Sequence, residues 1–199
     1  MLLKLEQSLN RLMEWLGKIA SLLLILLVLI MAFNVVSRYF FKASSIGLEE
    51  LSWHMYAAIF LLGIPYALKT GSHVRVDLLY ENFKPKTQAL IDLIGCSVFL
   101  IPTCIIIVWA GWHFTAASYG LGTQPESLDQ FFNMLLHEGV GEKSQDPGGL
   151  LNRWIIKGVI PLSFAFLLLA SVAFFINRLN VFLGHSNKDA KTVNPQEFL

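Results

Sequence analysis

Four apolar stretches, each at least 18 residues long, constrain the fold of this chain more than any other feature of its sequence. They cover residues 19–36, 51–68, 89–112 and 154–176. An α-helix of that length can cross about 30 Å of hydrocarbon. Because backbone N–H and C=O groups cannot stay unpaired in lipid, each stretch is expected to be a transmembrane helix. The sequence therefore predicts an all-α integral membrane protein with four spans.

The composition agrees with a membrane protein and argues against other classes. Charged residues make up 15% of the 199 residues, against roughly 25% in a soluble domain, and the mean hydropathy is +0.58. A formal net charge of +1 gives no reason to expect a nucleic-acid partner. Because the leader carries Glu6 and Glu14, the first stretch is expected to be a retained span rather than a cleaved signal peptide.

The distribution of lysine and arginine predicts the orientation of the spans, because cytoplasmic segments carry the excess of both. With a cytoplasmic N-terminus, the cytoplasmic segments hold Lys4, Arg11, Lys18, Lys69, Arg75, Lys84, Lys86, Arg178, Lys188 and Lys191. The outer segments then hold Arg38, Lys42, Lys143, Arg153 and Lys157. This excess predicts that both termini are cytoplasmic. Tryptophans at the span ends, including Trp53, would form an aromatic belt near the outer interface.

Two segments outside the spans have a helical apolar stripe. Residues 1–18 place leucines on one face and polar residues on the other, which predicts an amphipathic helix in the cytoplasmic interface or against a partner. In the outer loop, residues 113–153, a short helix is predicted from the spacing of Leu128, Phe131, Phe132, Leu135 and Leu136. Its apolar face could rest on lipid or on another protein. The polar segment 181–199 is expected to be a flexible cytoplasmic tail.

The spans lack the groups that transport or catalysis would need. A coupled carrier places ionisable residues near the middle of the membrane, whereas here they fall at or near the span ends. We find no catalytic triad, zinc-protease motif or nucleophile elbow. The sequence therefore indicates a non-catalytic accessory or scaffold subunit that needs no cofactor. Two alternatives stay open: a membrane cytochrome with haem between His54 and His113, and a small carrier that acts alone.

Charged residues flank the second span on both sides. Glu49 and Glu50 precede it, where the positive end of a helix dipole stabilises carboxylates, and Arg38 could pair with one of them. His73, Arg75 and Asp77 follow it and are expected at the cytoplasmic interface. Small residues within the spans, such as Gly63 and Gly95, are expected to let helices approach closely.

Three segments together resemble a known family. They are "RYFF" after the first span, "LEELSWHMYAAIFLLGIPYALKTGSHVRVDLL", and "GGLLNRWIIKGVIPLSF". In their order and spacing they resemble the small membrane subunit (DctQ-like, Q subunit) of tripartite ATP-independent periplasmic (TRAP) transporters, over roughly residues 15–180. The most specific pieces are Arg38, the Glu49–Glu50–Leu51 triplet and Gly71–Asp77. The outer segment 113–153 is longer than is usual in that family.

The resemblance implies a function and partners. In such systems a large membrane subunit of the M type moves substrate together with sodium, and a periplasmic binding protein delivers an organic acid. The small subunit extends the fixed scaffold in the bacterial inner membrane, among membrane lipids. The candidate structural or interface residues are Arg38, Glu49, Glu50, Trp53, His73, Arg75, Asp77, Phe131, Phe132 and Leu135.

Overall fold

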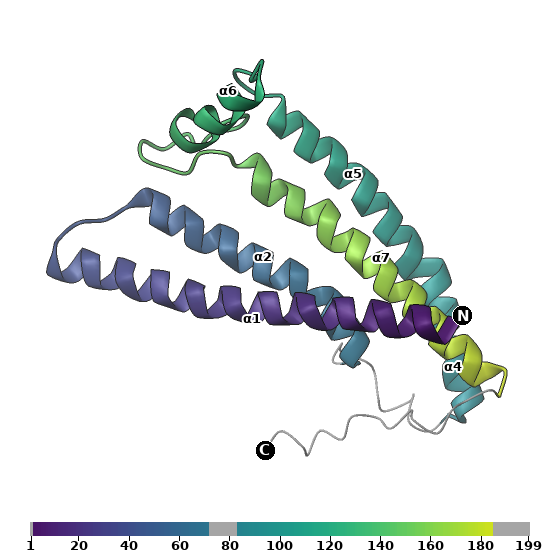
Figure 1. Ribbon diagram of the computed structural model, residues 1–199. Coiled ribbons are helices and arrows are strands. Elements are labelled where there is room, and N and C mark those ends of the chain that lie inside the picture. The colour runs from purple at the N-terminus through teal and green to yellow at the C-terminus, as the bar shows by residue number, and fades with distance from the viewer. Residues whose placement is uncertain (1, 72–82, 185–199) are drawn as a thin grey trace.

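The computed structural model describes residues 2–71 and 83–184, and this part of the chain consists of helices and their connections (Figure 1). The α-helices are α1 (Leu2–Phe40), α2 (Ile46–Thr70), α4 (Pro85–Gly95), α5 (Ile101–Tyr119), α6 (Leu128–Asn133) and α7 (Trp154–Phe182). Two π-helical turns, Cys96–Leu100 and Met134–Glu138, continue α4 and α6.

Four helical stretches are long and apolar enough to cross a membrane, as the sequence predicted. They are Ser8–Phe40, Ile46–Thr70, Lys86–Tyr119 and Trp154–Phe182. All of them extend beyond the predicted spans because polar and aromatic residues at the ends continue the helix. The last helix runs through residue 182, so it includes the first two residues of the segment predicted to be a tail.

The first helix is continuous through the point where the sequence predicted a change from an interfacial helix to a span. The 39 residues of α1 form one helix, about 58 Å long at 1.5 Å per residue. No proline interrupts it near residue 18, and Gly17 lies against the ring of Tyr66 from α2. A Cβ atom at Gly17 would stand 2.8 Å from Tyr66 Cδ2, so only glycine allows this approach.

The second helix begins and ends at residues suited to those positions. Ser45 caps its N-terminus, where its Oγ accepts a hydrogen bond from the Leu48 N–H at 3.4 Å. Gly71 ends it in the left-handed conformation, with φ of 68°, which glycine adopts without strain.

The third membrane-crossing helix contains a π-helical turn just before Pro102. The Ile101 N–H donates to the Cys96 carbonyl, five residues back, instead of to the carbonyl four residues back. Pro102 itself has no N–H to donate. The wider turn lets α4 continue into α5 without a break in the helix.

Helix α7 is the centre of the bundle and contacts α1, α2, α4 and α5. Its buried face carries small residues, including Ser163 and Ser171. On α5, Gly111 packs against Pro161 of α7. The Cδ of Pro161 would lie 3.1 Å from a Cβ at position 111. Close helix contact therefore depends on small side chains, as expected in a membrane, where the hydrophobic effect does not press helices together.

The bundle has two ends, which we name by what they carry. The terminus end holds the start of α1 and the end of α7, and the loop end holds the 120–153 connection between α5 and α7 (Figure 1). Near the terminus end, Met13 and Leu16 pack on Ala170 of α7, with Leu62 and Phe166 beside them. The N-terminal part of α1 therefore joins the packed core of the bundle.

Gly63 and Gly95 do not form close helix contacts within this chain, contrary to the expectation from sequence. A Cβ atom at either glycine would meet nothing within 4 Å. Both line an apolar groove of about 930 Å³ between α2, α4 and α7. Leu167 and Phe174 of α7 also line it, and Asp92 is its charged lining residue.

Candidate functional site

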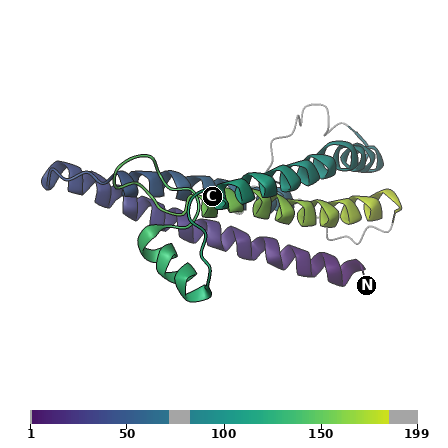
Figure 2. The same cartoon turned by 90° about the horizontal axis from the view of Figure 1, so that it is seen from above.

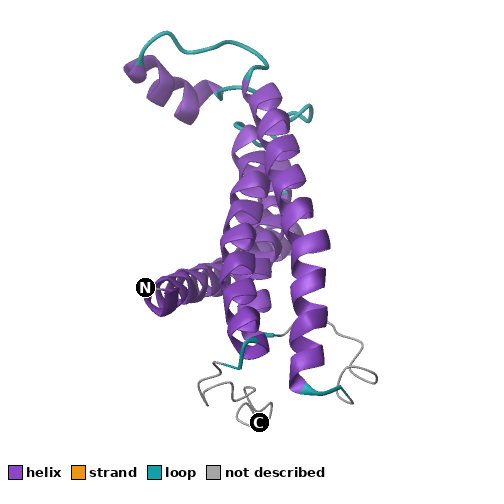
Figure 3. Cartoon of the chain, turned by 90° about the vertical axis from the view of Figure 1, so that its right-hand side faces the viewer, coloured by secondary structure: helices purple, strands orange, loops and turns teal. Residues whose placement is uncertain are grey.

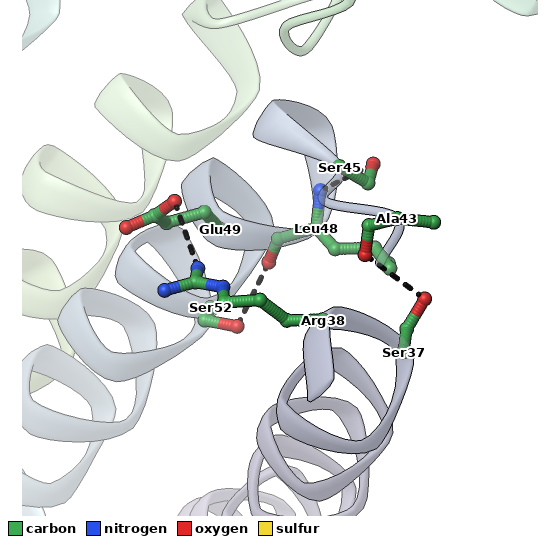
Figure 4. A network of polar contacts seen from close by, with 7 residues as sticks. All are labelled: Ser37, Arg38, Ala43, Ser45, Leu48, Glu49 and Ser52. Atoms are coloured by element: carbon green, nitrogen blue, oxygen red, sulfur yellow. Dashed lines mark hydrogen bonds and ion pairs between the residues drawn. The ribbon is translucent and has the colours of Figure 1, made fainter. Parts of the chain in front are cut away.

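Two membrane-crossing helices are joined at the loop end by an ion pair. Arg38 Nη2 of α1 lies 3.6 Å from Glu49 Oε2 of α2, as Figure 4 shows. This confirms the expectation that Arg38 pairs with one of the two adjacent glutamates. The two side chains are 52% and 55% exposed. An ion pair this exposed to water would contribute at most about 1 kcal/mol.

Serine side chains order the connection beside this ion pair (Figure 4). The Ser37 hydroxyl donates to the Ala43 carbonyl at 3.2 Å, and the Ser52 hydroxyl donates to the Leu48 carbonyl at 2.8 Å. The Ser37 bond and the Ser45 cap fix how the chain turns from α1 into α2, and the Ser52 bond lies within the first turns of α2.

Glu50 fastens the long outer connection to α2. Its Oε1 accepts a hydrogen bond from the Ser144 hydroxyl at 2.6 Å, and its Oε2 accepts one from the Leu150 N–H at 2.7 Å. A Cβ at Gly149 would lie 2.9 Å from Glu50 Oε2 and 2.4 Å from Ser144 Oγ. Glycine at position 149 therefore lets the loop close on the carboxylate.

Glu142 forms a second polar cluster, which joins the outer connection to α5 and α7. The Ser118 hydroxyl donates to its Oε2 at 2.7 Å, and the Lys157 ammonium donates to the same oxygen. These two hydrogen bonds, of which the one from Lys157 has the larger effect, hold the pKa of Glu142 below its ordinary value. Lys157 also lies 4.4 Å from the centre of the Phe114 ring. The partly buried ammonium of Lys157 is therefore stabilised by the Glu142 carboxylate and by the face of the Phe114 ring.

Asn152 connects the two halves of the outer segment. Its Oδ1 accepts a hydrogen bond from the Val140 N–H at 2.6 Å, and its Nδ2 donates to the Leu135 carbonyl at 2.8 Å. Asn152 has φ of 60°, a conformation that asparagine tolerates better than most residues. Through these bonds the short outer helix is held against the start of α7.

Ion pairs also join helices near the terminus end. Lys69 Nζ of α2 lies 2.5 Å from Glu14 Oε1 of α1, and Arg178 Nε of α7 lies 2.9 Å from Asp92 Oδ2 of α4. The Arg178 Nε–H does not point along a hydrogen-bond direction, so this contact is an ion pair only. Together with the contacts of the loop end, these pairs fasten the bundle at both of its ends.

The outer helix was predicted from its apolar spacing, and the structure has a helix there. Leu128–Asn133 forms α6, Ser127 caps it, and a π-helical turn continues it to Glu138. Phe131 and Leu135 are partly buried, whereas Phe132 is exposed. The three candidate contact residues of this helix therefore do not share one environment.

The remaining candidate residues are placed as follows. Trp53 is exposed on α2, near the loop end, as Trp109 and Trp112 are on α5. His73, Arg75 and Asp77 lie outside the described residues.

The two histidines of the haem hypothesis have different surroundings. His54 is partly buried on α2. His113 is exposed on α5, and its ring packs edge-on against Trp109 with 4.8 Å between the centroids. Within residues 2–71 and 83–184, no three His, Cys, Asp or Glu side chains are grouped so that they could hold a metal ion.

Sequence reasoning missed the contacts of Glu50 with the outer connection and the whole Glu142 cluster. The partners of Glu50 are 94 and 100 residues away in the chain, so no local pattern reveals them. The glycines near Glu50 and Glu142 in the folded protein were the weak sequence signal that the outer connection packs closely there. Gly141, with φ of 70°, would bring a Cβ within 2.8 Å of the Ser118 carbonyl oxygen.

These observations define a class of protein: a helical membrane protein with four helices able to span the bilayer, in which the ion pairs among the described residues lie near the two ends of the bundle. The sequence family described as "Tripartite ATP-independent periplasmic transporters, DctQ component" matches residues 27–181. Because this match covers more than half of the chain, the chain belongs to the DctQ family of small TRAP transporter permease subunits. It is a transporter component and not an enzyme.

One relative agrees with this assignment. A protein of Haemophilus influenzae described as a TRAP transporter small permease protein is 30% identical over 90 residues. That alignment covers 45% of this chain and 55% of the relative, so the chain spans only about half the length of the protein it matches. No solved structure matches this chain significantly.

Proposed function

We propose that this chain is the non-catalytic scaffold subunit of a sodium-coupled TRAP transporter that imports an organic acid. In this role it supports a large membrane subunit, which moves the substrate and sodium, while a periplasmic binding protein delivers the substrate. The loop end faces the periplasm of a bacterial inner membrane, and both termini are cytoplasmic.

The absence of charge from the middle of all four spans is the observation that carries this proposal. Residues 19–37, 51–68, 93–119 and 158–177 contain no Asp, Glu, Lys or Arg. Ion-coupled carriers use ionisable groups at that depth. A chain without them is suited to supporting transport rather than performing it.

The contacts near the helix ends suit a rigid support. Among the described residues, the ion pairs of α1 with α2 and of α4 with α7 connect neighbouring membrane-crossing helices. The Glu142–Lys157 pair connects the outer connection to α7. A scaffold must resist the movement of the domain that slides against it, and fastening at both ends of the bundle provides this resistance.

The test is to replace both glutamates of the loop end, Glu49→Ala together with Glu50→Ala. We expect a lower yield of the complex with the large subunit, or slower uptake, with no change in which substrates compete for uptake. The double substitution removes the Arg38–Glu49 ion pair between α1 and α2 and both hydrogen bonds that hold the outer connection to Glu50. Wild-type uptake together with wild-type complex yield would refute the anchoring role of this pair.

A further inference from the structure

The outer helix, residues Leu128–Glu138, presents an apolar face that nothing in the described chain covers. Leu128, Phe132 and Leu136 are 78%, 60% and 73% exposed. Spaced four residues apart, they lie on one side of the helix. We propose that this face rests in the lipid interface of the outer leaflet, so that the outer helix is a membrane-surface anchor.

The opposite side of the outer helix is fixed by its own chain. Met134 and the following Val140 are buried, and Asn152 bonds both the Leu135 carbonyl and the Val140 N–H. The helix therefore cannot turn its apolar side inward without breaking these bonds. These bonds therefore keep the face of Leu128, Phe132 and Leu136 turned away from the rest of the chain.

The position of the outer helix suits a surface anchor. Figures 1, 2 and 3 show α6 at the loop end, protruding sideways from the α5–α7 pair rather than continuing along it. Exposed Trp112 lies about 10 Å along α5 before its end at Tyr119, at 1.5 Å per residue. If this tryptophan marks the edge of the hydrocarbon, the end of α5 lies near the outer limit of the headgroup region, which is about 5–8 Å thick. Residues 120–127 connect this end of α5 to the outer helix.

Lipid fits this face better than a protein partner does. Three side chains offer a few hundred Å² of apolar surface, well below the roughly 800 Å² that each partner contributes to a stable protein interface. A helix already tied to a membrane-spanning bundle needs much less area to stay on the bilayer. The segment 126–138 contains Glu126, Asp129 and Glu138 but no Lys or Arg. Binding is therefore apolar insertion, and it does not require anionic lipid.

Spin labelling tests this proposal directly. Phe132→Cys and Leu136→Cys place a nitroxide on the apolar face, and Gln130→Cys and Glu138→Cys are matched controls at exposed polar positions on another side of the same helix. The native Cys96 and Cys104 are buried, so the unsubstituted protein serves as the blank. Each variant is measured in phosphatidylcholine bilayers, alone and with any subunits that co-purify.

Collision rates with oxygen and with a water-soluble nickel chelate distinguish the environments. We expect labels at 132 and 136 to collide several-fold more with oxygen, relative to the chelate, than labels at 130 and 138. Equal access of the chelate to all four positions would mean that the face stands in water, and the proposal fails. Exclusion of both reagents at 132 and 136 would mean that a protein covers the face, and the proposal fails in that case too.

Discussion

Glu49 and Glu50 are neighbours in the sequence, but their carboxylates hold different parts of the molecule. Glu49 reaches back to Arg38 in the preceding helix, and Glu50 reaches forward to the connection that precedes α7. The first contact could be predicted because Arg38 ends one span and Glu49 begins the next. The second could not, because it depends on how the outer connection folds over the bundle.

The two glutamates should therefore differ in their effect on stability. Glu50→Ala leaves the Ser144 hydroxyl and the Leu150 N–H without their acceptor, and hydrogen bonds to a charged group contribute about 1.5–3 kcal/mol. Glu49→Ala removes a half-exposed ion pair and should cost less than about 1 kcal/mol. Thermal unfolding of the purified variants in detergent measures both costs. Equal costs for the two substitutions would contradict this division of roles.

The Glu142 cluster should make stability depend on pH in one direction. Because its pKa is lower in the folded protein than the ordinary value of 4.5, Glu142 stabilises the fold fully above that pH. Its contribution is lost as the pH falls through the lowered pKa. Glu142→Gln should therefore be less stable than wild type near neutral pH. The difference in unfolding temperature between the two proteins should narrow below pH 4.5.

Unfolding temperatures of both proteins between about pH 3 and 7 measure this gap. Other carboxylates titrate in the same range, but they do so in both proteins, so the difference isolates Glu142. A gap that stays constant over the whole range would show that Glu142 does not act through its charge.

At the scale of helices, the apolar runs could be predicted and their ends could not. Hydrophobic length reveals a span, but the helix continues wherever the backbone meets no proline or left-handed residue, as α1 does through residue 18. The sites of close packing were also beyond sequence reasoning. A glycine within a span can face a neighbouring helix, as Gly111 does, or open space, as Gly63 does.

These two glycines make a matched pair of substitutions. Gly63→Ala adds a methyl group where nothing lies within 4 Å and improves helix propensity, so stability should stay the same or rise by up to about 1 kcal/mol. Gly111→Ala places its methyl group 3.1 Å from Pro161 Cδ and should destabilise by roughly 1–3 kcal/mol. Thermal unfolding of the isolated chain compares them. A less stable Gly63→Ala beside an unaffected Gly111→Ala would contradict the packing described here.

For the whole molecule, the distribution of basic residues predicts the orientation in the membrane. We predict that the loop end faces the periplasm and the terminus end the cytoplasm. Lys143 and Lys84 are exposed residues of these two ends. Lys143→Cys should react with a membrane-impermeant maleimide in spheroplasts, and Lys84→Cys should react only after lysis. The reverse labelling pattern would show that the loop end faces the cytoplasm and would contradict the predicted orientation.

The family and the uncharged interior of the spans could both be recognised from the sequence, because they rest on composition and on local motifs. The outer connection could not be placed, because Glu50, Glu142 and Asn152 act through contacts between distant segments. Those contacts join the outer connection to α2, α5 and α7, as the proposed scaffold role requires.

In the proposed function, this chain works as part of a larger membrane complex. Purification of the tagged chain from its native membrane in mild detergent, with mass spectrometry of the co-eluting proteins, tests it most directly. We predict a large multi-span protein of carrier type in stoichiometric amount. Recovery of the chain alone, in detergents that preserve known membrane complexes, would contradict the scaffold function.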